Sequence, residues 1–164
     1  MTRPAFITVT LVAIIALAAG ASAAPLPIVL DSGVTRGPVA AHGTTRDAVA
    51  TTPPSSFRTT IDAVPAGARL LTAIAVAGPV PGPSASPLRF RVHLEVDGTS
   101  TTLYDRILDG TDARDRRWID VGISLGPFAG RAGTLRFETV PAQADAPRRP
   151  SRSAWTDRAC EVGP

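Results

Sequence analysis

The chain has 164 residues, of which 44% are hydrophobic and 19% charged, a composition typical of one globular domain. All 17 basic residues are arginine, and 14 acidic residues leave a net charge of +3. The absence of lysine excludes Schiff-base and P-loop chemistry, and a single cysteine excludes an internal disulfide. Because arginines alternate with acids along most of the chain, we expect no nucleic-acid partner.

The first 23 residues have the three parts of an export signal. Arg3 supplies a positive charge, Ala5 to Ala19 form an apolar run, and Ala21-Ser22-Ala23 provides small residues for cleavage. The alternative is an uncleaved anchor, but 15 apolar residues are few for a bilayer core that needs about 20. We therefore expect residues 1–23 to be cleaved, leaving a secreted or extracytoplasmic protein with no stable membrane span.

Beyond the signal, the sequence divides into two parts. Residues 24–44 are rich in Gly, Pro, Thr and Ala and predict an extended N-terminal segment, in which Pro27–Leu30 is a candidate strand. Residues 45–164 predict the folded domain, with a further short strand at Asp47–Ala50.

The segment Leu88–Val96 carries the clearest structural pattern. Apolar residues alternate with Arg89, Arg91, His93 and Glu95. Successive side chains of a strand point to opposite faces, so the pattern predicts a strand with one apolar and one charged face. A helix would scatter both sets around its circumference.

The segment Arg69–Ala77 is apolar at nearly every position. Nine residues between Gly67 and Gly78-Pro79 are short for an amphipathic helix, so we favour a central strand covered on both sides. Other strands are expected at Ser56–Ile61, Thr101–Leu108, Trp118–Leu125, Gly133–Val140 and Ala154–Val162. Seven to eight short strands without a helical period predict an all-β fold, an antiparallel two-sheet β-sandwich.

Six short segments follow a pattern found in a known family of domains: Pro65–Leu70, Arg117–Val121, Ile123–Leu125, Phe128–Gly130, Thr134–Thr139 and Trp155–Asp157. They resemble segments of bacterial jelly-roll domains similar to the galactose-binding-like fold of carbohydrate-binding modules. The resemblance covers Thr45 to Val162 and includes one departure, Arg158, at a position where the family usually has proline. It implies a jelly-roll fold more strongly than a function.

Aromatic residues are the first candidates for sugar contact, because the apolar face of a pyranose stacks on aromatic rings. Trp118, Trp155 and Tyr104 are the candidates here. Trp118 has the opposite parity from Ile119 and its neighbours, which points it outward unless a bulge turns it. The alternative, which we favour for both tryptophans, is packing in the core or at its rim.

The charged face formed by Arg89, Arg91 and His93 is a second candidate, suited to an acidic polysaccharide or a phosphate. The alternative, which we favour, is a solvated face. In that case these residues would pair across strands with Asp105, Arg136 and Glu138.

A third candidate is a calcium site formed by Asp109, Asp112 and Asp115. The spacing does not match an EF-hand, and neighbouring arginines compete for the acids. We therefore expect no metal and no cofactor.

The sequence has no nucleophile elbow and no metalloprotease motif, so we expect no enzyme. The first hypothesis is a secreted, non-catalytic module that binds carbohydrate at the cell envelope. The alternative is a structural or protein-interaction sandwich with an envelope protein as partner, acting through a sheet edge or through Arg148, Arg149 and Arg152. Cys160 is expected to be buried or to cross-link two copies.

Overall fold

The computed structural model describes residues 28–30, 34–77, 86–143, 152–156 and 161–163, and the description below concerns these residues. The predicted signal peptide, Arg148, Arg149 and Cys160 lie outside them. In the described part of the chain, no helix is long and apolar enough to cross a membrane.

The described residues form strands and one short 3-10 turn, with no α-helix among them. The 3-10 turn, Gly126–Phe128, places Phe128 against the core. The strands are β1 (Ile28–Leu30), β2 (Val34–Ala41), β3 (Thr44–Thr51), β4 (Ser55–Ile61), β5 (Arg69–Ala77), β6 (Leu88–Val96), β7 (Thr99–Leu108), β8 (Ile119–Ser124), β9 (Gly133–Pro141), β10 (Arg152–Thr156) and β11 (Glu161–Gly163).

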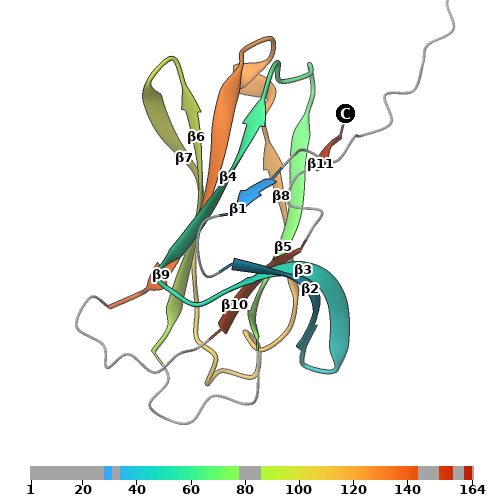
Figure 1. Ribbon diagram of the computed structural model, residues 1–164, viewed down its shortest axis with the longest axis vertical. Helices are drawn as coiled ribbons and strands as arrows, with labels where there is room; N and C mark the ends of the chain where they lie inside the picture. The colour runs from blue at the N-terminus through green and yellow to red at the C-terminus, as the bar shows by residue number, and fades with distance from the viewer. Residues whose placement is uncertain (1–27, 31–33, 78–85, 144–151, 157–160, 164) are drawn as a thin grey trace, which may run out of the picture.

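The strands build two antiparallel sheets that pack face to face (Figure 1). The first sheet has the order β1-β4-β9-β6-β7. In the second, β5 pairs with β8 along one edge and with β10 and β11 along the other, and β3 and β2 continue beyond β10. The predicted β-sandwich is therefore confirmed.

The connections between strands cross repeatedly from one sheet to the other. From β3 to β10 the chain changes sheet at every step except the β6–β7 hairpin, the connectivity expected of a jelly roll. That hairpin turns through Asp97 and Gly98, whose φ angles are 50° and 73°. Positive φ at both central residues is the geometry that Asp-Gly favours in a two-residue hairpin.

Strands β1 and β2 lie in the stretch that we expected to be an extended N-terminal segment. β1 pairs with β4, and β2 pairs with β3 over its whole length. The β2–β3 hairpin has no predicted counterpart, since residues 34–41 combine Gly, Pro and Thr without a clear period. The predicted strand Asp47–Ala50 lies within β3, toward its C-terminal end.

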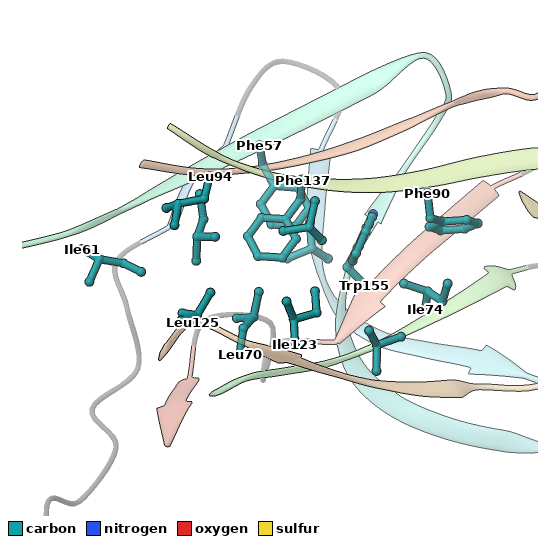
Figure 2. Packing of buried hydrophobic residues seen from close by; sticks show 14 of the residues in the cluster. Phe57, Ile61, Leu70, Ile74, Phe90, Leu94, Ile123, Leu125, Phe137 and Trp155 are labelled. Carbon is teal, nitrogen blue, oxygen red and sulfur yellow. The ribbon is translucent and has the colours of Figure 1, made fainter. Parts of the chain in front are cut away.

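The core between the sheets is organised around one tryptophan. The Trp155 ring is edge-on to Phe57, Phe90 and Phe137, with centroid distances of 6.1, 5.4 and 5.3 Å (Figure 2). Phe57 and Phe137 stack at 4.7 Å, as expected for neighbours directly opposite on β4 and β9. The indole Nε1 donates a hydrogen bond to Thr139 Oγ1 at 2.9 Å, which satisfies the one polar group that Trp155 brings into the core.

Strand β5 is covered on both sides over most of its length, as predicted. Leu70, Ile74 and Val76 join the main core. On the other side, Ala73, Ala75 and Ala77 belong to a second buried cluster. The exceptions lie at the start of the strand, where Arg69 is exposed and Leu71 is 45% exposed.

We expect Phe137→Ala to lower the free energy of unfolding by about 3–5 kcal/mol, because it removes a buried ring that contacts two other rings. Chemical denaturation followed by far-UV circular dichroism measures this change. Phe128→Ala is the matched control, since Phe128 is only partly buried and should cost less. A loss for Phe137→Ala no greater than that of the control would contradict this account of the core.

Candidate functional site

The residues that the sequence suggested for ligand contact lie in three separate places. Trp155 lies between the sheets and is 1% exposed, so its ring has no face open to solvent. Its packing among three phenylalanines is structural.

Trp118 lies on the outer side of the second sheet, as its parity predicted, and is nevertheless buried at 7% exposed. It packs with alanines from several strands, and we call this buried cluster the alanine layer. Its Nε1 donates a hydrogen bond to the Thr44 carbonyl at 3.0 Å. The other members of this alanine layer are Ala41, Ala48, Ala73, Ala75, Ala77 and Ala154, with Val39 packed against them.

The β2–β3 hairpin is strongly curved (Figure 1) and takes part in the alanine layer, to which it contributes Ala41 and Ala48, with Val39 packed against them. β2 approaches β5, although β3 and β10 separate the two in the hydrogen-bonded order. Arg46 on β3 reaches Asp120 on β8 at 2.6 Å, and its guanidinium carbon lies 5.5 Å from the centre of the Trp118 ring. Small side chains permit this close approach, and the hairpin leaves no open aromatic platform at Trp118.

Tyr104 lies on β7 with its ring packed against the edge of the main core. Burial raises the pKa of its phenol above the ordinary value of 10.0, and the neighbouring Arg106 guanidinium opposes part of that rise. The ring therefore lies at the sandwich edge and not on the charged face of β6.

The carboxylates proposed for calcium are engaged by their own loop. Asp109 accepts hydrogen bonds from the Thr111 backbone and hydroxyl at 2.9 and 2.7 Å. Asp112 accepts one from the Arg114 backbone at 2.8 Å, and Asp115 accepts one from the Asp109 backbone at 3.0 Å. No group of three metal-ligating side chains occurs in the part of the chain that the structure describes.

The outer side of the first sheet is the candidate site, and we call it the polar face. On β4, β6 and β9 the inward positions away from the strand ends are buried. The outward positions are partly or fully exposed and, apart from Val140, polar. The pairing register arranges them in rows that cross the strands. From one end of the face to the other, the rows are Thr60–Thr134–Glu95–Ser100, Arg58–Arg136–His93–Thr102, Ser56–Glu138–Arg91–Asp105 and Val140–Arg89–Ile107.

Glu138 is the centre of this face. Its carboxylate lies 3.4 Å from Arg91, 3.0 Å from Arg136 and 3.7 Å from His93 Nε2. Thr102 Oγ1 lies 3.1 Å from His93 Nδ1, so both ring nitrogens have polar neighbours. Three nitrogen-bearing side chains therefore surround one carboxylate. The Glu138 side chain is only 17% exposed.

Asp105 on β7 extends the network to the sheet edge. It lies 3.2 Å from Arg89 Nε and 3.5 Å from Arg91 Nε. Arg91 therefore joins Asp105 to Glu138. The predicted cross-strand pairing with Asp105, Arg136 and Glu138 is confirmed, and Arg58 is the member that sequence reasoning missed.

The structure thus brings Arg89, Arg91 and His93 together and separates them from both tryptophans. Trp118 lies on the outer side of the other sheet, and packed sheets are about 10 Å apart. A ligand on the polar face therefore meets arginine, histidine, carboxylate and threonine groups rather than a tryptophan ring.

No family model and no curated protein matches the chain. Among solved structures, the chain is similar to the family 51 carbohydrate-binding module from Clostridium perfringens GH95, solved with methyl-galactose. The TM-score is 0.51 at 12% identity, and the alignment covers 83% of this chain and 91% of that one. This likeness shows the fold alone: the chain has a β-sandwich fold similar to that of this carbohydrate-binding module.

Two further modules match at lower scores. A module specific for non-crystalline cellulose (family 28) has a TM-score of 0.47 and 9% identity over 83% of this chain and 86% of that one. A family 29 module mutant has a TM-score of 0.40 and 9% identity, with 82% of each chain covered.

We expect Arg46→Met to expose Trp118 to the quencher acrylamide, because the guanidinium that covers its ring is removed. The loss of stability should be about 1 kcal/mol. Trp155 is fully buried and contributes little to quenching. Asp120→Asn is the control, since it removes the ion pair while leaving the guanidinium over the ring. Unchanged quenching in Arg46→Met would contradict the described packing.

Tyr104 is the single tyrosine, so its titration can be followed without ambiguity by absorbance near 295 nm. We expect its midpoint in the folded protein to lie above 10.0 and to fall toward that value in urea. Because the folded-state pKa is the higher one, the stabilising effect is present below pH 10 and is lost as the pH rises further. Tyr104→Phe should remove the loss of stability that ionisation of Tyr104 causes above pH 10. A titration midpoint at or below 10 in the folded protein would contradict the raised pKa.

Proposed function

We propose that this protein is an exported, non-catalytic carbohydrate-binding module whose ligand contacts the polar face. One observation carries the proposal: Arg91, His93 and Glu138 form a connected, partly exposed network on a regular sheet surface. Such groups supply donors and acceptors side by side, which is what adjacent hydroxyls of a sugar require. The β-sandwich fold of the galactose-binding module supports the same proposal.

The network is also preorganised for binding. Arg91 is held between Asp105 and Glu138, and Glu138 is fixed from three sides. A side chain held by neighbours loses less conformational freedom when a ligand binds. The predicted signal in residues 1–23 supports a location outside the cytoplasm, where such modules meet polysaccharides.

The experiment is a panel of soluble polysaccharides tested by affinity gel electrophoresis, followed by calorimetry on those that retard the protein. We expect Arg91→Gln and His93→Ala to weaken binding roughly tenfold or more each, because hydrogen bonds to charged groups contribute about 1.5–3 kcal/mol.

Arg114→Gln is the matched control, because Arg114 is exposed in the β7–β8 loop and belongs to none of the rows of the polar face. Denaturation curves establish that each variant is folded. The proposal fails if no polysaccharide binds, or if the control variant loses as much affinity as Arg91→Gln.

A further inference from the structure

One row of the polar face holds three basic side chains with no acid among them. Arg58 on β4 is directly opposite Arg136 on β9, and Arg136 is directly opposite His93 on β6. Like charges placed directly opposite on neighbouring strands destabilise a sheet. The fold gains nothing from the Arg58–Arg136 pair.

The neighbouring acids do not neutralise this row fully. Glu138 is shared by Arg91, Arg136 and His93. Among the described residues, no carboxylate forms an ion pair with Arg58, which is exposed. Arg58 and Arg136 therefore present a net positive site, in which the Arg58 residue is exposed and the Arg136 side chain is 47% exposed.

We propose that this row, Arg58–Arg136–His93, binds the anionic group of an acidic polysaccharide, a carboxylate or a sulfate. The inference rests on the proposed function and names its ligand class. Neighbouring strands are about 4.8 Å apart, so one carboxylate or sulfate group can contact two adjacent guanidinium groups. Arginine binds such groups with paired hydrogen bonds, which lysine cannot reproduce.

The surroundings of the row favour a sugar acid over other polyanions. Carboxylates lie in both neighbouring rows, Glu138 and Asp105 on one side and Glu95 on the other, and accept hydrogen bonds from hydroxyl groups. Thr60 and Thr134, in the same row as Glu95, donate or accept. A ligand with one anionic group among many hydroxyls matches this mixed surface. A continuous phosphate backbone would instead meet the carboxylates of Glu138 and Asp105 and be repelled.

The test compares pairs of probes that differ only in charge. Polygalacturonate is compared with its methyl ester, and dextran sulfate with dextran, at low and at high salt. We expect the anionic member of at least one pair to bind tenfold or more tighter, with the difference reduced by salt. The two pairs distinguish a carboxylate from a sulfate.

Single substitutions test whether the preference for the anionic probe depends on the Arg58–Arg136–His93 row. Arg58→Gln and Arg136→Gln should each remove most of the preference for the anionic probe, while Arg114→Gln, which loses the same charge elsewhere, should keep it. Arg58→Gln should also melt at the same or a higher temperature, because it relieves a like-charge pair. A merely structural arginine would instead show a lower melting temperature.

The outcomes separate this inference from the proposed function. Equal binding of charged and neutral probes, or binding of the neutral ones alone, overturns the inference and leaves the proposed function standing. Binding of no polysaccharide overturns both. Double-stranded DNA or anionic lipid vesicles bound as tightly as polygalacturonate, with the same loss in Arg58→Gln, would overturn the assignment to a sugar acid.

Discussion

The packing of aromatic rings on the inner side of the first sheet fixes everything on its outer side. Phe57, Phe90 and Phe137 lie on three adjacent strands and enclose Trp155. Because side chains alternate along a strand, setting the register of these rings also sets which charged residues become neighbours. A slip of one residue on β9 would bury Arg136 and Glu138 and expose Phe137. The hydrophobic core thus positions the polar face without contacting it.

The second sheet depends on a different constraint, the close packing of side chains on its outer side. The β2–β3 hairpin of the same sheet takes part in this packing, and a close approach of this kind requires small side chains. Alanines on β3, β5 and β10 provide them, and Trp118 closes the layer at one end. Arg46 and Asp120 hold the hairpin from outside. The outer side of the second sheet is therefore part of the folded interior where the alanine layer lies. The outer side of the first sheet carries the exposed polar residues.

The difference between the two outer sides, one buried and one exposed, has a consequence for ligand recognition. With both tryptophans buried, recognition on the exposed face depends on charge and hydrogen bonding rather than on stacking. Interactions of this kind are directional and weaken with salt. The two arginines that face each other across β4 and β9 are therefore better understood as parts of a binding surface than as parts of the fold.

The sequence by itself determined the fold class, because two-residue alternation in Leu88–Val96 and Gly133–Val140 admits only half-buried strands. It also placed Arg89, Arg91 and His93 on one face and named their partners. It favoured burial of both tryptophans, which the structure confirms. It did not reveal the β2–β3 hairpin, whose composition resembles a loop, nor that the residues packed around Trp118 include members of that hairpin. The Arg58–Arg136–His93 row arises only from the pairing of β4, β9 and β6, which are distant in the chain. Periodicity fixes the face on which a side chain lies, whereas its neighbours on that face are decided by strand order and register, which tertiary packing selects.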